Sequence, residues 1–239
     1  MKLYMDEAWR GPLYWPLHIG LVSNPWISEK ELKKHKLFQD SKTLSPKKRE
    51  EAFNEITELE KNGKLIISIG TISSKIIDDF WVTRAINIAV SKALYKILSK
   101  LLWKKTKKII KIKEVNNLSK EYEQKYEPIE IIFDWKTDFW IGKDLGIKTS
   151  TIVHWDATCV QISIASILAK VSRDKILDNV ALNYPEYWFE KHKGYGTKLH
   201  YEAIETHWVL KEHRKLFLKK TFPNRKIQKY DYNTSFSIN

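Results

Sequence analysis

Three short apolar segments of the chain each end in a carboxylate residue. They are residues 1–6 with Asp6 and Glu7, residues 129–134 with Asp134, and residues 147–155 with Asp156. Short apolar runs that alternate with longer helical patterns predict the strands and helices of an α/β sheet. Because such folds place their sites where strands end at one edge, we expect these carboxylates to converge.

Four carboxylates at one place would repel one another unless cations neutralise them. Two Mg²⁺ or Mn²⁺ ions about 3.5–4 Å apart would do so, and could clamp the attacking and leaving oxygens of a phosphodiester. Asp6 and Glu7 are adjacent, so they can face one site only where the strand twists into the turn at Arg10-Gly11-Pro12. The alternative is that each acid caps a loop or lies in a solvated acidic turn.

Composition narrows the class of protein. The 239 residues carry a formal net charge of +13, which points to an anionic polymer such as a nucleic acid; a lysine-rich proteome is the other explanation. The single cysteine, Cys159, excludes a disulfide framework or a zinc–cysteine cluster. No apolar run approaches the ~20 residues of a membrane span, and no signal-peptide pattern is present, so a soluble cytoplasmic protein is expected.

The remaining pattern predicts one domain at residues 1–217 and a basic tail at 218–239. Further strands are expected at 13–23 and 65–72, and helices at 46–61, 75–102, 161–180 and from 199 onward. Ser45 and Pro46 begin the first of these helices as N-cap and first-turn residue. The stretch 103–127 is rich in lysine and glutamate with weak periodicity, so we predict a solvated excursion there.

Several motifs follow one another along residues 1–217. They are Asp6-Glu7-Ala8-Trp9-Arg10-Gly11-Pro12, Asp40-Ser41-Lys42, Phe133-Asp134, Trp155-Asp156-Ala157, the run from Ile162 to Asp174, Tyr184-Pro185-Glu186-Tyr187, and His192-Lys193-Gly194-Tyr195-Gly196-Thr197. In this order they strongly resemble the ribonuclease HII family. The resemblance implies the ribonuclease H-like fold, a mixed five-stranded sheet flanked by helices, with a C-terminal helical segment.

The resemblance also implies an activity. The family consists of endonucleases that cleave the RNA strand of RNA–DNA hybrids and cut 5′ to ribonucleotides embedded in duplex DNA. Two Mn²⁺ or Mg²⁺ ions would serve the reaction, which leaves 5′-phosphate and 3′-hydroxyl ends. The expected partners are therefore hybrids and ribonucleotide-containing duplexes, with no membrane, and the expected state is a monomer.

Carried over by motif, the catalytic and metal-binding residues would be Asp6, Glu7, Asp134 and Asp156, with Asp6 bridging both ions. Trp9, Arg10 and Gly11 occupy the family's Gly-Arg-Gly loop, whose backbone contacts 2′-hydroxyls. The 2′-hydroxyl is the group that distinguishes RNA from DNA.

The resemblance implies further substrate-binding residues. Tyr195 matches the tyrosine that stacks at the ribose of an RNA–DNA junction; the alternative is a turn aromatic packed on the core. Phosphate contacts as point charges are implied for Lys42, Lys170, Arg173 and Lys193. For Lys170 and Arg173 the alternative is an exposed helix face that pairs with Asp174 or a neighbour.

Two other functions remain open at this point. Another ribonuclease H-like nuclease, such as a resolvase, would cut a four-way junction and leave a hybrid intact. A catalytically impaired hybrid-binding protein would bind hybrids tightly without cutting them in Mn²⁺, because bulky tryptophan would fill the loop of the site.

The tryptophans depart from the family pattern. The family has glycine at eight of the ten tryptophan positions, namely Trp9, Trp15, Trp81, Trp135, Trp140, Trp155, Trp188 and Trp208. The chain has only 8 glycines, whereas glycines and its 10 tryptophans together make about 7.5% of the residues, near the usual ~7% for glycine. The hypothesis is that UGA codons, which the source organism translates as glycine, stand here as tryptophan. The alternative is an aromatic-rich, degenerate homologue.

Overall fold

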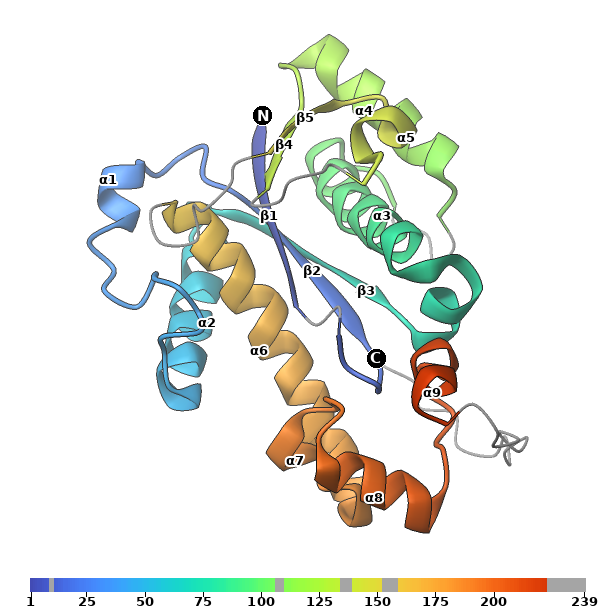
Figure 1. Cartoon of the computed structure of the whole chain (residues 1–239). Coiled ribbons are helices and arrows are strands. Elements are labelled where there is room, and N and C mark those ends of the chain that lie inside the picture. Colours follow the sequence, from blue (N-terminus) through green and yellow to red (C-terminus); the bar gives the residue numbers. More distant parts are fainter. Residues whose placement is uncertain (9–10, 106–109, 134–138, 152–158, 223–239) are drawn as a thin grey trace.

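One mixed β-sheet organises the molecule (Figure 1). The computed structural model describes residues 1–8, 11–105, 110–133, 139–151 and 159–222. In these residues the strands are β1 (Lys2–Ala8), β2 (Leu17–Ser23), β3 (Ile66–Ile72), β4 (Glu130–Phe133) and β5 (Lys148–Thr151), in the spatial order β3-β2-β1-β4-β5. β1 pairs antiparallel with β2 and parallel with β4, which pairs parallel with β5. The predicted mixed five-stranded sheet is thereby confirmed.

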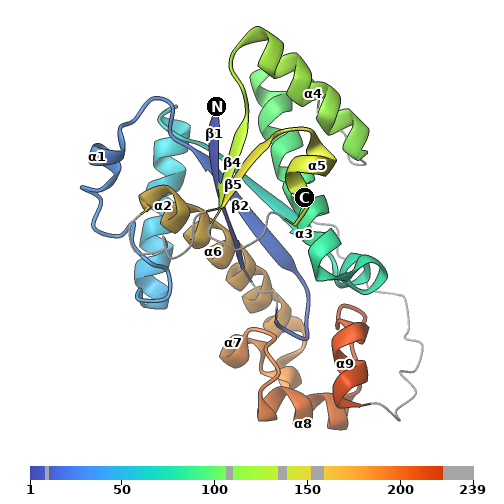
Figure 2. The ribbon, with the colours of Figure 1, turned by 45° about the horizontal axis from the view of Figure 1, so that its top comes forward.

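Helices cover both faces of the sheet (Figures 1 and 2). The described helices are α1 (Glu29–Leu32), α2 (Pro46–Lys61), α3 (Ser74–Leu101), α4 (Ile112–Lys125), α5 (Ile141–Leu145), α6 (Val160–Asn183), α7 (Phe189–His192), α8 (Lys198–His207) and α9 (Lys215–Thr221), with a 3₁₀ turn η1 at Pro185–Tyr187. α3 packs on β2 and β3, and α6 packs on β1 and β2 from the opposite side. α4 lies outside α3, and α2 lies against α6.

A glycine lets α6 approach the sheet closely. A Cβ atom on Gly20 of β2 would lie 2.3 Å from the carbonyl oxygen of Ala165. Any larger residue would therefore push α6 away from β1 and β2. Leu3 and Met5 of β1 point into the apolar layer under α3, so the alternation of a strand puts Asp6 on the face that α6 covers.

The last helices form a separate apolar cluster at the end of α6. η1, α7, α8 and α9 surround side chains that include Tyr14, Tyr187 and Phe189, all buried. Figure 2 shows these helices gathered beyond the lower end of α6. The predicted start of a tail at residue 218 falls inside α9, where Leu218 is buried, and residues 223–239 lie outside the described part.

Two sequence expectations need correction. The segment predicted as a solvated excursion contains α4, whose Val115, Leu118 and Tyr122 are buried against the α3 layer. These three residues form a narrow apolar stripe at helical spacing among lysines and glutamates, which explains its weak pattern. The helix predicted at 75–102 is present as α3, but it is kinked at Trp81, whose backbone is not helical.

Candidate active site

Asp6 and Glu7 both lie within β1, before it ends at Ala8. The backbone N–H of Glu7 donates to Oδ1 of Asp6 at 2.8 Å, and the hydroxyl of Ser166 on α6 also hydrogen-bonds Asp6. The two carboxyl groups lie within hydrogen-bonding reach of each other. Desolvation raises the pKa of Asp6, and this effect exceeds the lowering of the pKa by these hydrogen bonds and by the positive charge of Lys42. A desolvated acid beside a second acid is a donor set that fits a hard divalent cation.

The register of the sheet brings the ends of three parallel strands to one edge. Met5, the residue before Asp6, pairs with Phe133 of β4, and Phe133 pairs with Thr151 of β5. Asp134 directly follows Phe133 in sequence, but Asp134 and Asp156 lie outside the described residues. Within the described ranges, no three acidic, histidine or cysteine side chains gather as a metal site. The four-carboxylate ligand set therefore stays a prediction.

A serine pair fastens the loop after α1 beside Asp6. The hydroxyls of Ser41 and Ser166 lie 2.9 Å apart, and Ser41 is buried. Asp40 shapes this loop, because its Oδ1 accepts from the backbone N–H of Lys42 at 2.9 Å. Lys42 itself is exposed, and its charge acts on Asp6. The predicted Lys42 thus lies near the carboxylates, while the contact of Ser166 with Asp6 was missed by sequence reasoning.

Backbone hydrogen bonds join the loop after β1 to the loop before α8. The N–H of Leu13 donates to the carbonyl of Gly194 at 2.8 Å, and the N–H of Arg214 donates to the carbonyl of Leu13 at 2.7 Å. The loop after β1 is therefore held beside the loop before α8 and the start of α9, segments about 180 and 200 residues away in sequence. Trp9 and Arg10, predicted to bind substrate, lie outside the described residues.

This junction brings Gly11 and Tyr195 together. Cε1 of Tyr195 lies 3.9 Å from the place that a Cβ on Gly11 would occupy. Tyr195 is 42% exposed, so part of it is accessible to solvent beside the loop. Burial of its other side raises the pKa of the hydroxyl, and the charge of Glu7 also raises it. Two of the predicted substrate-binding residues thus lie next to each other and near a predicted metal ligand.

Arg173 lies inside this junction and reaches no surface. Its side chain is fully buried, and it donates to the carbonyls of Pro16 at 2.9 Å, Lys193 at 2.8 Å and Tyr14 at 3.1 Å. A direct phosphate contact, and the alternative of an exposed helix face, are both inconsistent with this burial. Arg173 instead holds the two loops that carry Gly11 and Tyr195.

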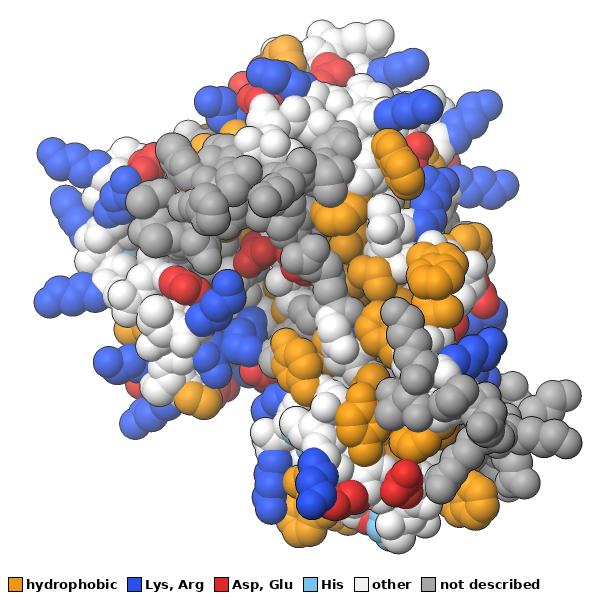
Figure 3. All heavy atoms as spheres, in the orientation of Figure 1, with side chains coloured by type: hydrophobic (Ala, Val, Ile, Leu, Met, Phe, Trp, Pro, Cys, Tyr) orange, Lys and Arg blue, Asp and Glu red, His pale blue; other side chains and the backbone are white. Residues whose placement is uncertain are grey.

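The other predicted lysines have acidic neighbours. Nζ of Lys170 lies 3.8 Å from Asp174, and Lys193 forms an ion pair with Asp178. Burial lowers the pKa of Lys170, and Asp174 opposes that shift. In Figure 3, acidic side chains lie near the middle of the face shown, with lysine and arginine side chains below and to the left of them and around the rim of the face. An anionic strand could therefore be held around a central acidic site.

A chain of neutral histidines supports the backbone of Tyr195. His213 Nδ1 accepts from the N–H of Leu210 at 2.8 Å, so its proton is on Nε2, which lies 3.0 Å from Nε2 of His200. His200 Nδ1 then donates to the carbonyl of Tyr195 at 2.7 Å. His192 accepts from the N–H of Gly194 at 3.1 Å and so helps to order the loop that carries Tyr195. The roles of His200 and His213 had no local sequence signal.

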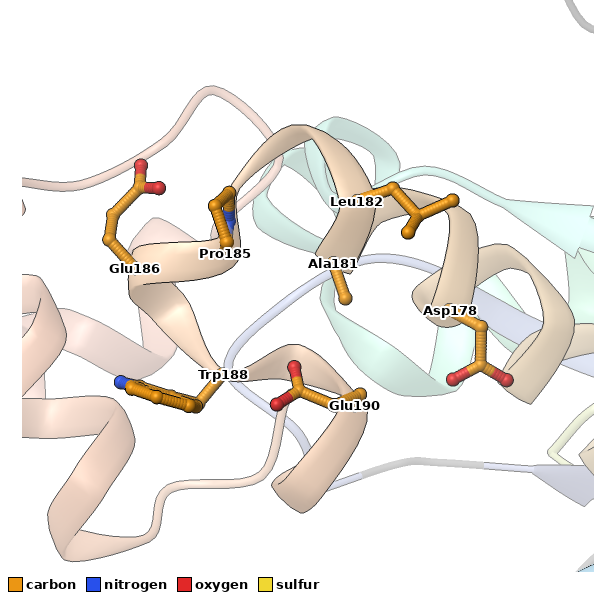
Figure 4. Close-up of a pocket in the computed structure, with 7 residues that line it drawn as sticks. All are labelled: Asp178, Ala181, Leu182, Pro185, Glu186, Trp188 and Glu190. Atoms are coloured by element: carbon orange, nitrogen blue, oxygen red, sulfur yellow. The ribbon is translucent and has the colours of Figure 1, made fainter.

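A pocket of about 600 Å³ lies beside the ion pair of Lys193 with Asp178 (Figure 4). It is lined by Asp178, Ala181, Leu182, Pro185, Glu186, Trp188 and Glu190. Three acidic side chains face it, so it would repel a nucleic acid. The pocket lies between the end of α6, η1 and α7, and none of the predicted site residues lines it.

The sheet order, the helices on both faces and the acidic strand end define a ribonuclease H-like fold. The ribonuclease H2 from Pyrococcus horikoshii OT3 shares it, with a TM-score of 0.64 and 21% identity over 94% of this chain and 99% of that chain. A chain of the PCNA:RNase HII complex from Archaeoglobus fulgidus also shares it, with a TM-score of 0.64 and 19% identity over 95% of this chain and 98% of that chain.

Sequence similarity identifies the family to which the chain belongs. The family model described as Ribonuclease HII matches residues 3–224. Proteins named Ribonuclease HII are 37% identical over 216 residues in Bacillus cytotoxicus, covering 89% of this chain and 66% of that protein, and 33% identical over 213 residues in Shewanella halifaxensis, covering 89% and 85%. The chain belongs to the ribonuclease HII family and is a nuclease of the ribonuclease H type. None of its described helices is long and apolar enough to cross a membrane.

Proposed function

We propose that the protein hydrolyses the RNA strand of RNA–DNA hybrids and cuts 5′ to ribonucleotides embedded in duplex DNA. The observation that carries this proposal is that Tyr195 lies next to Gly11, close enough for the charge of Glu7 to act on its hydroxyl. A stacking ring next to a loop backbone suits a nucleotide whose 2′-hydroxyl must be recognised. The products would carry 5′-phosphate and 3′-hydroxyl ends.

The metal ligands of this proposal are Asp6, Glu7, Asp134 and Asp156. When bound, two Mg²⁺ or Mn²⁺ ions would supply an activated water and stabilise the developing charge on the phosphate. The solved structure of Bst-RNase HIII in complex with Mn²⁺ has the same fold, with a TM-score of 0.54 and 12% identity. In this chain, Ser166 and the N–H of Glu7 orient Asp6, and the network around Arg173 holds the two substrate loops.

One assay tests the proposal. A DNA duplex with a single embedded ribonucleotide is incubated with the protein in Mg²⁺ and in Mn²⁺, beside a continuous hybrid and a four-way junction. Cleavage 5′ to the ribonucleotide, and of the hybrid, is expected. Cleavage of the junction alone would favour a resolvase, and tight binding to the hybrid without cleavage in Mn²⁺ would favour a hybrid-binding protein.

We also propose that the protein is a cytoplasmic monomer. Light scattering of the purified protein would give its mass in solution and so test the monomeric state.

A further inference from the structure

Five tryptophans have backbone conformations that glycine normally adopts. Seven tryptophans are described, and those with positive φ angles are Trp81 (64°), Trp103 (55°), Trp140 (59°), Trp188 (56°) and Trp208 (77°). Among all other described non-glycine residues, only Phe139 and Lys193 have positive φ. Since only a few per cent of non-glycine residues adopt this region, seven tryptophans would be expected to supply fewer than about one case.

Two of these conformations exclude side chains almost entirely. Trp81 has φ 64° and ψ 162°, and Trp208 has φ 77° and ψ −174°. This region of the φ/ψ map is essentially restricted to glycine, because a Cβ atom collides with the neighbouring peptide groups. Trp81 lies at the kink of α3, and Trp208 ends α8. Both are places where a helix must change direction or stop, which glycine commonly permits.

The ends of α2 and α3 offer an internal comparison. Gly63, with φ 70°, follows the last residues of α2, and Trp103 occupies the same position after α3. The two ends share one pair of hydrogen bonds: Gly63 to Glu60 (3.0 Å) and Lys64 to Leu59 (2.9 Å), against Trp103 to Lys100 (3.3 Å) and Lys104 to Ser99 (2.8 Å). This is the Schellman arrangement, in which the left-handed residue is usually glycine.

Four of the five tryptophans are also more than half exposed. The exposed fractions of the five residues run from 42% for Trp188 to 95% for Trp103. A large aromatic side chain contributes to stability by burial, so these rings offer little to offset a strained backbone. Trp188 also forms one wall of the acidic pocket of Figure 4, so the size of that pocket depends on the residue at position 188.

We infer that positions 81, 103, 140, 188 and 208 carry glycine in the protein that the source organism makes, and that their codon is UGA, which that organism translates as glycine. By composition the assignment extends to all ten tryptophan positions. It includes position 9, in the loop proposed to contact 2′-hydroxyls. The inference rests on backbone conformation and does not depend on the proposed substrate.

Two direct observations test this assignment. The codons at the five positions should be UGA, and peptides of the protein isolated from its own organism should have the mass of glycine there. Protein with glycine at all ten positions would also show no tryptophan fluorescence. UGG codons, or peptides carrying indole mass at positions 81 and 103, would overturn the assignment.

A set of recombinant chains tests the conformational argument separately. One chain has the printed sequence, one has glycine at the five positions, and one has alanine there, which keeps the Cβ atom. The glycine chain should unfold about 10–20 °C above the printed chain, whereas the alanine chain should recover little of that shift. If the printed chain does not fold, only the glycine chain should yield soluble folded protein. Equal recovery with alanine would contradict the inference.

A matched control separates this effect from the simple loss of an exposed indole. Trp26 is 63% exposed, close to the 62% of Trp81 and of Trp208, but the φ angle of Trp26 is not positive. The substitution W26G should leave the unfolding temperature within about 2 °C or lower it, since glycine loses more backbone freedom on folding there. If W26G raised the unfolding temperature as much as W81G, measured alongside it, exposure and not backbone conformation would be responsible.

Discussion

The Nε2 atoms of His200 and His213 lie 3.0 Å apart, and only one of them can carry the proton between them. His213 supplies it, and His200 passes a hydrogen bond from Nδ1 to the carbonyl of Tyr195. Burial lowers the pKa of His200 to about 4 and lowers that of His213 well below its usual value. A proton added to His200 would place two N–H groups against each other, so the pair is stable only when neutral.

Acid should therefore destabilise the protein below about pH 6.5. The unfolded chain takes up protons on these histidines there while the folded chain does not, so the free energy of unfolding falls as the pH falls. One such histidine contributes a slope of about 1.4 kcal/mol per pH unit until its folded pKa is reached. Urea unfolding at pH 7, 6 and 5 should show that H200Q has a slope smaller by about this amount. The exposed His207 provides the control, because H207Q should leave the slope unchanged.

Replacing Arg173 by lysine should loosen the junction between the two substrate loops. One ammonium group cannot reach the three carbonyls that the guanidinium holds, so buried acceptors lose their partner. We expect R173K to lower the free energy of unfolding by about 2–4 kcal/mol. K175Q, on the exposed side of α6, should change it by less than about 0.5 kcal/mol. If R173K left the free energy of unfolding unchanged, the three hydrogen bonds of Arg173 would contribute nothing to the stability of the fold.

Removing one predicted metal ligand should abolish activity without unfolding the chain. D134N keeps the shape of the side chain and removes its charge, so cleavage should fall by at least about a hundredfold. D6N should lower cleavage to a similar extent. In EDTA at pH 8, the free energy of unfolding of D6N should be no lower than that of the parent. The reason is that burial raises the pKa of Asp6, so its ionised form costs stability above that pKa. Full activity of either variant, or cleavage in excess EDTA, would exclude the proposed metal site.

Tyr195 should contribute through its ring. Stacking on a nucleotide is worth about 1–3 kcal/mol, so Y195A should cut the embedded-ribonucleotide duplex about tenfold to a hundredfold more slowly. Y195F keeps the ring and should retain most of the rate. Single-turnover cleavage of the duplex and of a continuous hybrid would measure both. If Y195A matches the parent, Tyr195 is only a turn aromatic packed on the core.

Local signals predicted the fold where they were strong. α2 was predicted with its observed bounds, because Ser45 and Pro46 begin it and Asn62-Gly63 ends it. α4 was missed because its three buried side chains are spread through a run of charges. The burial of Arg173 could not be predicted either. Its carbonyl partners Tyr14 and Pro16 are 159 and 157 residues away, and only the folded chain brings them to it.

The left-handed tryptophans also bear on the stability of the chain as printed. Each strained residue costs about 1–3 kcal/mol, so five of them approach the whole stability of a typical domain, about 5–15 kcal/mol. The printed chain should therefore fold poorly, although its core layers are well filled.

β1 ends at Ala8, one residue before the first tryptophan position. Under the assignment made above, a ribosome that treats UGA as a stop would release a peptide ending at Ala8. That peptide would contain Asp6 and Glu7 but neither α6 nor the other strands. A ribosome that inserts tryptophan would make a full chain in which the five tryptophans between positions 81 and 208 have positive φ angles. The gene would thus be useless to most cells that acquired it, and its exchange would be confined to organisms that share the same decoding.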